Sequence, residues 1–381
     1  MHGDQVRAYH QIRCLAGRHA ITLLAFGDVP ADSRWRTEMA ACCERVIAVR
    51  RPPFGIALRA LAALGSRLPL QVAMYDALPA GVGLDALLGA SGFDLAHVQL
   101  ARLGPMLRRL APLPCVVDFI DALSLNMARR AAFDRAPASW LAKMESSRLA
   151  RYERAICAEA AATAICSAQD RAAVGNFPNL HVVGNGADLD QFPFVATRDR
   201  GTDIVFIGNL GYFPNVDATS WFALEVMPIL VARVPAARFK LVGARPAPAL
   251  RRIAARQSNV DLVGPVSDVH PHLASAAVAV VPLRAGSGQQ LKILEAMAAG
   301  TPVVATTLSA AGLDAVDGQH LLIADSAEAM ADAIARLLSE RELRERIARS
   351  ARALIETRYT WEQSALDLEC VWFAAAGTTS R

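Results

Sequence analysis

The sequence predicts an α/β protein made of two domains, each a doubly wound parallel sheet. Three observations predict this fold class. At 381 residues the chain is long for one hydrophobic core. Short apolar runs of strand length alternate with helical stretches along most of the chain, as they do in parallel sheets. A polar linker, Arg198–Thr202 (RDRGT), separates two such series. We therefore expect domains at 1–195 and 196–356, with a last helical segment at 357–381.

The first domain is predicted to open on a helix that begins at Gly3-Asp4. Val6, Tyr9, Ile12 and Leu15 are spaced to share one face of this helix. The strands expected after it are His19–Phe26, Arg45–Arg50, Phe93–Gln99, Cys115–Asp121, Ala162–Cys166 and Leu180–Val183. No strand precedes the helix, so either this sheet lacks its first strand or the true start lies upstream.

The second domain is predicted to begin with a fresh strand, Asp203–Gly208 (DIVFIG), and a loop into a helix. Further strands are expected at Arg238–Gly243, Val260–Val263 and Ala277–Leu283. Surface helices at Met330–Leu338 and Glu342–Ile355 and a last helix at Tyr359–Phe373 complete the pattern.

Composition excludes several classes of protein. Over half of the residues are apolar and a fifth are charged, which is typical of a globular chain. The net charge of +4 is mild and no compact Lys/Arg run accompanies it, so we expect no nucleic-acid partner. The seven cysteines lack CxxC or zinc-site spacing, which favours reduced thiols, a cytoplasmic location and no metal. No signal peptide and no apolar run of about 18 residues is present.

One segment suggests a membrane surface. Pro52–Leu70 places Ile56, Leu58, Leu61 and Leu64 among arginines 51, 59 and 67. A basic amphipathic helix of this kind fits peripheral contact with an anionic membrane. The commoner alternative is a helix that faces the core with solvated arginines, and the sequence leaves both open.

The stretch around which the second domain is organised is Arg284–Val304 (RAGSGQQLKILEAMAAGTPVV). It predicts a glycine loop, Gly286-Ser287-Gly288, and then a helix from about Gln289 to Ala299. Ser287 with Gln290 three residues later predicts a capping box, which would aim the loop amides outward. A helix N-terminus that follows close-approach glycines is a ready site for an anion.

Charged residues flank this predicted anion site. Arg284 and Lys292 supply positive charge, and Lys292 and Glu295 are three apart on one helical face. A diphosphate followed by a ribose diol would meet these groups in that order. The alternative is an ordinary capping loop in an α/β domain, with Lys292 and Glu295 as a solvated ion pair.

Several motifs together resemble family 4 glycosyltransferases, which are retaining enzymes of the GT-B fold. They are EAMAAGTPVV in the helix, the turn Gly184–Asp188 with Phe192 (NGxDxxxF), GNLGYFPNVDA after the fresh strand, and ARFKLVG. The chain looks most like bacterial sugar transferases of exopolysaccharide synthesis. The resemblance implies two Rossmann-like domains that face each other across a cleft, the first for the acceptor and the second for the donor. The last helix would cross back to the first domain.

The resemblance implies roles for particular residues. Glu295 would bind the nucleotide ribose, while Arg284, Lys292 and the Gly286–Gly288 amides would hold the departing diphosphate. The other donor-side residues implied or proposed are Gly208, Asn209, Ser287, Gln289 and Gln290. On the acceptor side, Gly3, Asp4 and Arg7 match the family's first loop, with a helix start and surface charge as the alternative. Asp121 is the polar group expected at the end of its strand, where doubly wound sheets bind ligands; a turn or helix-cap aspartate is the alternative.

Three positions depart from the family pattern. Ser287 stands where many members have a glutamate that contacts the donor sugar, and Ile120 stands where they often have a histidine. No arginine or lysine directly follows the strand Asp203–Gly208. Arg284 and Lys292 would then have to supply the phosphate-binding charge.

The implied activity is transfer of a hexose from a nucleoside diphosphate sugar to an acceptor hydroxyl with retention of configuration. The acceptor would be a glycan precursor or a lipid-linked molecule, and neither a metal nor another cofactor is expected. Two alternatives stay open: a GT-B protein that binds without turnover, and a nucleotide-sugar epimerase. A nicotinamide dehydrogenase is disfavoured, because no GxGxxG opens a helix ahead of an acidic residue.

Overall fold

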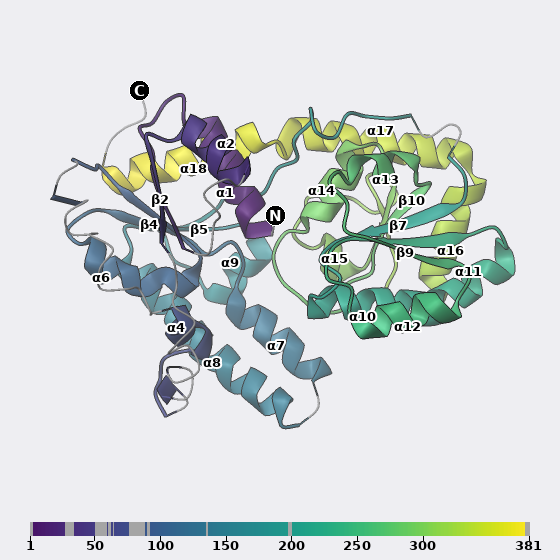
Figure 1. Cartoon of the computed structure of the whole chain (residues 1–381), viewed down its shortest axis with the longest axis horizontal. Helices are drawn as coiled ribbons and strands as arrows, with labels where there is room; N and C mark the ends of the chain where they lie inside the picture. The colour runs from purple at the N-terminus through teal and green to yellow at the C-terminus, as the bar shows by residue number, and fades with distance from the viewer. Residues whose placement is uncertain are drawn as a thin grey trace. The chain divides into compact units, whose positions relative to one another are not determined.

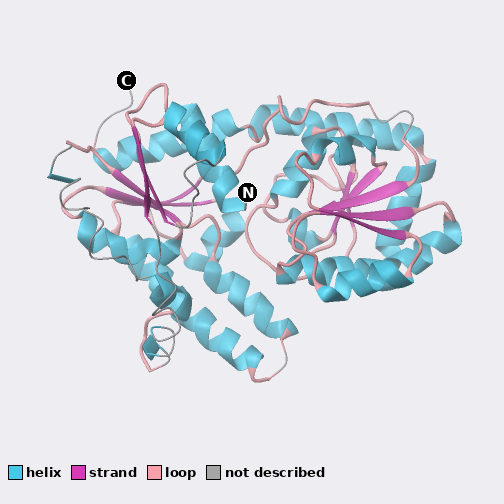
Figure 2. Cartoon of the chain, viewed as in Figure 1, coloured by secondary structure: helices cyan, strands magenta, loops and turns pink. Residues whose placement is uncertain are grey.

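The computed structural model of the chain describes residues 3–26, 34–49, 59, 62–63, 65–75, 88–89, 92–134, 136–196 and 200–377. Its internal contacts divide it into two compact units (Figure 1). Unit 1 comprises Met1–Gly184 and Trp361–Arg381, and unit 2 comprises Asn185–Thr360. Both units are α/β, with every paired strand of the described residues parallel and helices packed on the sheets (Figure 2). The predicted fold class, two Rossmann-like parallel-sheet domains, is confirmed.

Unit 1 contains two sheets in its described residues, the pair β1-β2 and the four-stranded sheet β3-β4-β5-β6. Their strands are β1 Thr22–Phe26, β2 Arg45–Val49, β3 Ala96–Gln99, β4 Cys115–Asp118, β5 Ala162–Ile165 and β6 Leu180–Val182. All six predicted strands of this half are confirmed, each with shorter bounds. Among the described residues no strand precedes the first helix, and none joins the pair β1-β2 to the larger sheet by hydrogen bonds.

The helices of unit 1 include one from the far end of the chain. They are α1 Gly3–Leu15, α2 Arg34–Cys42, α4 Leu70–Tyr75, α6 Leu107–Leu110 after the 3-10 turn Ala101–Met106, α7 Leu123–Phe133, α8 Ala138–Glu159, α9 Ala168–Val174 and α18 Trp361–Ala376. Leu368 and Val371 of α18 are buried in one cluster with Val116 of β4 and Ala164 of β5. The last helix therefore completes the core of unit 1.

The buried face of α1 differs from the predicted one. Apolar spacing predicted a face of Val6, Tyr9, Ile12 and Leu15, but the buried residues are Arg7, His10, Gln11 and Leu15. The reason is that α1 packs against α18, which offers polar and aromatic partners. The amide of Gln11 donates to Ser364 Oγ over 3.0 Å, and the ring of His10 stacks on Trp361 at 4.9 Å. Periodicity of apolar residues cannot reveal a face that is buried through polar pairing.

Unit 2 is built on one six-stranded sheet of order β12-β11-β10-β7-β8-β9. Its strands are β7 Asp203–Ile207, β8 Arg238–Val242, β9 Val260–Gly264, β10 Val278–Val281, β11 Val303–Ala305 and β12 Leu322–Ile323. The chain runs outward from β7 to β9, returns to the centre at β10 and then runs the other way. The neighbours β7 and β10 are thus the switch point of the sheet, where doubly wound folds bind ligands.

Helices cover both faces of this sheet (Figure 2). They are α10 Phe213–Trp221, which continues through the π-helical turn Phe222–Val226 into α11 Met227–Arg233, then α12 Pro248–Arg256, α13 His270–Ser275, α14 Leu291–Ala298, α15 Thr307–Ala310, α16 Ala327–Ser339 and α17 Arg341–Arg358. Side chains of β7 alternate between two cores: Ile204 and Phe206 lie in one, and Val205 lies in the other with Ile293 of α14. This alternation is the period of two expected for a strand buried on both faces.

The structure describes the turn at 184–188 in full, and the linker and the basic segment only in part. The turn Gly184–Asp188 straddles the division between the units, and Ala187 belongs to unit 2, where its N–H donates to the carbonyl of Tyr359 over 2.8 Å. Of the linker 198–202, residues 198 and 199 lie outside the described residues, as do 52–58, 60, 61 and 64 of the basic segment.

Candidate functional site

The donor-side residues lie in two loops of unit 2 that follow neighbouring strands. Gly208 and Asn209 come directly after β7, and the segment 284–290 comes after β10. Because both strands are parallel and paired, both loops leave the same edge of the sheet. The switch point therefore brings together two segments about 80 residues apart in the sequence.

The glycine loop after β10 depends on two left-handed backbone positions. Gly286 has φ 123° and Gly288 has φ 75°, values that side chains other than glycine rarely adopt. These conformations keep the chain out of the helix until Leu291, where α14 begins. The predicted capping box is therefore wrong. Gln290 is itself the residue before the helix, and its amide donates to the carbonyl of Ser287 over 3.2 Å.

Gln289 links this loop to its surroundings. Its side chain is buried; Oε1 accepts from the Asn185 N–H over 2.6 Å, and Nε2 donates to the Gly312 carbonyl over 3.1 Å. Both ends of the amide are thus engaged by backbone groups of unit 2. The structure gives Gln289 a role in holding the loop in position.

Lys292 lies in the first turn of α14 and is held by a residue in the first turn of α10. Its Nζ donates to Oδ1 of Asn215 over 2.8 Å and lies 4.9 Å from the centre of the Phe206 ring. Burial lowers the pKa of Lys292 to about 8, while the nearby Glu295 opposes that shift. A partly buried ammonium interacts with an incoming anion more strongly than an ammonium in bulk water does.

Glu295 follows one turn later on the same helix. Burial raises the pKa of Glu295 to about 7, and the charge of Lys292 partly counteracts this. Both side chains are partly buried, so the two groups are less solvated than an ion pair on the surface would be. A carboxylate in such a place is suited to accept hydrogen bonds from a diol.

Arg284 is fixed by a residue that the sequence reasoning missed. Its Nε and Nη2 donate to the two oxygens of Asp217 over 3.0 and 2.6 Å, and its guanidinium lies 5.5 Å from the centre of the Trp221 ring. Asp217 and Trp221 are four residues apart on α10, so they present one face to Arg284. The spacing of Asp217 and Trp221 in NVDATSW is the sequence signal that could have revealed this contact.

Asn215 is the second residue that the sequence reasoning missed, and it connects α14 to the loop after β7. It is buried; its Oδ1 accepts from Lys292, and its Nδ2 donates to the carbonyl of Asn209 over 2.9 Å. Asn209 in turn accepts the Gly211 N–H on its side-chain oxygen over 3.0 Å. The structure thus brings Gly208, Asn209, Lys292 and Arg284 into one arrangement around α10.

The predicted acceptor-side residues lie in unit 1, and Arg7 is buried there. Its Nε donates to Asp118 over 2.6 Å, and both side chains are fully buried. Its two terminal nitrogens donate to the carbonyls of Gly184 and Val183 over 3.0 and 2.9 Å. The alternative of surface charge is therefore wrong for Arg7. This guanidinium joins α1 to the carboxyl ends of β4 and β6.

The remaining unit 1 residues cluster at the same sheet edge. The carbonyl of Asp4, next to the exposed Gly3, accepts from the Gln99 side chain at the end of β3 over 2.9 Å. The strand predicted to reach Asp121 ends at Asp118, so Asp121 lies in the segment after β4, where it is partly exposed. Ile120, which lies between the end of β4 and Asp121, has φ 66°, an unusual conformation for a β-branched residue. Its N–H is held by Asp118 Oδ1 at 2.9 Å.

His97 is a packing residue of unit 1. It lies in β3, and its Nδ1 accepts from the indole N–H of Trp372 over 3.1 Å. Burial lowers the pKa of His97 to about 4, so the ring is neutral at ordinary pH.

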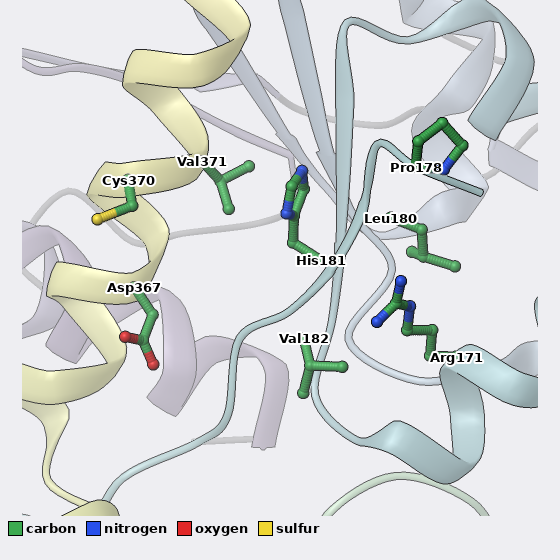
Figure 3. A pocket seen from close by; sticks show the side chains of 8 residues that line it. All are labelled: Arg171, Pro178, Leu180, His181, Val182, Asp367, Cys370 and Val371. Carbon is green, nitrogen blue, oxygen red and sulfur yellow. The ribbon is translucent and has the colours of Figure 1, made fainter. Parts of the chain in front are cut away.

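A cavity of about 440 Å³ lies elsewhere in unit 1, between α9, β6 and α18 (Figure 3). Arg171, His181, Asp367 and Cys370 are among its lining residues. In Figure 3 the Cys370 thiol and the Asp367 carboxylate point away from the His181 ring, so they do not converge on one point. The cavity holds none of the residues predicted to form the site.

The described residues contain neither a candidate metal site nor a helix that could span a membrane. Within the described part of the chain, no three or more His, Cys, Asp or Glu side chains group in a way that could hold a metal ion. Every helix that the structure describes is too short or too polar to cross a bilayer.

Comparison with known proteins supports one family. Residues 201–340 match the model for the family "Glycosyl transferases group 1". Phosphatidyl-myo-inositol mannosyltransferase of Mycobacterium tuberculosis is 31% identical over 212 residues, which are 52% of this chain and 55% of that protein. Its counterpart in Mycobacterium leprae is 37% identical over 128 residues, or 32% and 34% of the two chains. The chain thus spans about half the length, or less, of the curated relatives it matches.

Solved structures match over nearly the whole chain. Sucrose-phosphate synthase from Thermosynechococcus elongatus superposes with a TM-score of 0.70 at 20% identity, covering 96% of this chain and 92% of that one. HepE from Anabaena, solved with UDP and glucose, gives a TM-score of 0.66 at 16% identity and covers 96% and 95%. At such identities the likeness shows the fold alone. The solved structures thus show the GT-B fold for the chain, and the family model with the mycobacterial relatives shows that residues 201–340 match the group 1 glycosyl transferases, of the family 4 type.

Proposed function

We propose that this chain transfers a hexose from a nucleoside diphosphate sugar to an acceptor hydroxyl, with retention of the anomeric configuration. The observation that carries the proposal is the arrangement at the switch point of unit 2. Lys292 and Arg284, each held by a residue of the segment 215–217, flank a glycine loop at the N-terminus of α14. Glu295 lies one turn further along the same helix.

The chemistry of the proposed reaction fits these groups. Transfer from such a donor leaves a nucleoside diphosphate, so its barrier falls when the negative charge developing there is stabilised. Fixed cations and a helix N-terminus provide that stabilisation without reorganising during the reaction. Lys292, Arg284, the Gly286–Gly288 backbone and Gln290 would contact the diphosphate, and Glu295 would accept hydrogen bonds from the ribose hydroxyls. Gly208 and Asn209 would complete the donor side, with Ser287 beside the sugar.

The similar proteins support parts of this proposal. HepE is described in complexes with UDP and with UDP-glucose, which supports a nucleotide-sugar donor. The mycobacterial relatives carry the name phosphatidyl-myo-inositol mannosyltransferase, which supports a lipid acceptor and a hexose. We extend both to this chain as a class of donor and a class of acceptor.

The wider setting is proposed on the same basis. Transfer would proceed without a metal ion, in the cytoplasm, on a glycan precursor or lipid-linked acceptor of exopolysaccharide synthesis. Gly3 and Asp4 of unit 1 would contribute on the acceptor side and Asp121 would take part in catalysis. Arg7, predicted with Gly3 and Asp4, is fully buried and would contribute by holding α1 in place. The protein would contact the inner face of the cytoplasmic membrane peripherally.

Thermal unfolding with a panel of nucleoside diphosphates and their sugars tests the donor site. Binding to the folded state alone raises Tm, and a ligand at 100 times its Kd stabilises by about 2.7 kcal/mol. We expect one base to raise Tm of the wild type and of the control Glu328→Ala, an exposed position on α16. The nucleoside diphosphate with the same base should leave the Tm of Glu295→Ala unchanged. Stabilisation of Glu295→Ala equal to that of the wild type would refute the assigned site.

The alternative of a non-catalytic protein is tested by turnover. Release of the nucleoside diphosphate from its sugar, in the presence of membrane lipid extract, should accompany binding. Binding without release of nucleoside diphosphate with any acceptor tested would favour the non-catalytic alternative. The departures from the family pattern at Ser287 and Ile120 favour the same alternative.

A further inference from the structure

Helices α7 and α8 of unit 1 form a hairpin, packed side by side along their length. Figure 1 shows the end where Phe133 of α7 gives way to the start of α8 projecting from the body of the unit. The proposed donor site makes no use of this end. It is also distant in sequence from every predicted acceptor-side residue except Asp121.

Three large apolar side chains are exposed at this end. Phe133 is 41% exposed, Trp140 70% and Leu141 46%, and they fall within nine residues of one another in the chain. Trp140 is the most exposed of all the large apolar side chains that the structure describes. Isolated exposed apolar residues need no explanation, but a cluster that includes a tryptophan marks a contact surface. We call these three residues the hairpin tip.

The charge around the hairpin tip is positive. Between Ala122 and Met144 the sequence contains one acidic residue, Asp134, which accepts from Arg130 Nε over 3.0 Å. Lys143 is exposed beside the tip. The next carboxylate along α8, Glu145, is buried, and its two oxygens accept the N–H groups of Leu70 and Gln71 over 2.9 Å each.

Two described residues of the basic segment, Ala63 and Leu70, contact the same helix. Arg148 of α8 donates to the carbonyl of Ala63 over 2.9 Å, which fastens that part of the segment to the hairpin. Within its described residues, Arg59 and Arg67 are exposed. The hairpin thus carries the apolar tip and also binds the basic segment, in which Arg59 and Arg67 are exposed.

The dimensions of the tip favour a lipid surface over a protein partner. Three partly exposed side chains offer roughly 300 Å², since each aromatic side chain can bury about 150–250 Å². A stable protein interface needs about 800 Å² on each side. Tryptophan is instead enriched at the depth of lipid headgroups, and basic side chains around an apolar tip match anionic lipids.

We infer that the hairpin tip is the membrane-docking element of this protein, with Phe133, Trp140 and Leu141 entering the headgroup region of an anionic bilayer. Lys143, Arg59 and Arg67 attract the phosphates at its surface. This inference rests on the peripheral membrane contact proposed above and names the surface that makes it.

Flotation of the full chain with vesicles tests the inference. Vesicles of phosphatidylglycerol and phosphatidylcholine should carry the wild type, and vesicles of phosphatidylcholine alone should carry at least fivefold less. The double variant F133S/W140S should lose at least fivefold of the binding to anionic vesicles. Leu224→Ser is the matched control, since Leu224 is 51% exposed on unit 2, and it should bind as the wild type does. Lys143→Glu should weaken binding, whereas Arg251→Glu, an exposed position on α12, should not.

A second measurement locates the contact even if the double variant folds poorly. Brominated lipid should quench part of the tryptophan fluorescence of the wild type, and Trp140→Phe should abolish that quenching while it retains most of the binding. Quenching that persists in Trp140→Phe, or equal loss of binding in Leu224→Ser, would overturn the inference while leaving a membrane contact elsewhere. Absence of vesicle binding would overturn it together with the membrane contact. Self-association that F133S/W140S abolishes would assign the tip to a second copy of the chain. Nucleotide-dependent shifts of Tm in the same samples report separately on the donor site.

Discussion

The ammonium of Lys292 lies 2.8 Å from the side-chain oxygen of Asn215. The two residues lie in the first turns of the helices that follow the neighbouring strands β10 and β7, and their bond fixes the cation in α14 to the start of α10. Asn215 is buried and bonded at both ends of its amide. Its position is thus determined by the fold, and it transmits that position to Lys292.

Replacing Asn215 with alanine should weaken donor binding more than it weakens folding. The Nζ of Lys292 loses the acceptor that orients it, and hydrogen bonds to charged groups contribute about 1.5–3 kcal/mol. We expect the donor Kd to rise about tenfold or more, measured by titration calorimetry. Asn179→Ala is the control, because Asn179 is a bonded asparagine in unit 1 whose amide donates to the carbonyls of Cys157 and Ala160. An equal loss of donor affinity in both variants would contradict a positioning role for Asn215.

Arg284→Lys should slow turnover although it retains the charge. The lysine ammonium cannot reproduce the two-pronged contact with Asp217 or the stacking on Trp221. We expect kcat to fall about tenfold, measured by release of nucleoside diphosphate. Arg238 and Asp261 provide a matched control, since their pair is also two-pronged, at 2.9 and 2.6 Å, and lies exposed on β8 and β9. Arg238→Lys should leave kcat unchanged; a similar loss there would remove the case for Arg284.

Glu295→Gln should stabilise the fold in a pH-dependent way. Burial raises the pKa of Glu295 from 4.5 to about 7, so the folded state holds a proton that the unfolded chain has released. Ionised Glu295 therefore lowers the free energy of unfolding progressively as the pH rises from about 4.5 to 7. Glutamine removes that cost, and we expect a gain of about 1 kcal/mol at pH 8 and almost none at pH 4.5. The gain falls short of the full pKa shift, because Glu295 is only partly buried and solvent screens its charge.

Urea unfolding at the two pH values measures this difference. Glu328→Gln, at an exposed position, should change stability little at either pH. The same Glu295→Gln protein should bind the donor more weakly. A loss of stability at pH 8 would show that the carboxylate is needed for the fold itself.

Removing one partner of the buried pair Arg7–Asp118 should be severely destabilising. Asp118→Ala leaves the Arg7 guanidinium buried without its carboxylate, which typically costs about 3–5 kcal/mol. We expect the double variant R7M/D118A to lose less stability than the sum of the single variants, measured by urea unfolding. Strictly additive losses would show that the pair does not act as a unit.

The strands and the donor-side residues could be predicted from the sequence because both rest on local patterns. Buried parallel strands such as β7 and β10 are short apolar runs, and the segment 284–300 carries its glycines, cations and carboxylate in one stretch. Which other segment would meet it could not be predicted from periodicity. Asn215 and Asp217 belong to the site only because β7 and β10 are neighbours in the sheet, and these two strands are not consecutive in the chain.

The burial of polar residues is the second feature that could not be predicted from the sequence. The buried face of α1 carries Arg7, His10 and Gln11, which look like solvent-facing residues in a helical pattern. They are buried because Asp118, Trp361 and Ser364 supply matching groups from distant parts of the chain. The start of α14 was also misplaced, since the conformations of Gly286 and Gly288 delay the helix to Leu291.

The packing of α18 on the sheet of unit 1 has a consequence for biosynthesis. Ala365, Leu368 and Val371 fill a core whose other members all precede residue 184. Unit 1 therefore cannot close until the last helix has emerged from the ribosome, whereas every residue of unit 2 has been synthesised by Thr360. Domains commonly fold from the N-terminus onward during translation. In this chain the order is reversed: the second unit can complete its fold while the first still waits for its final helix.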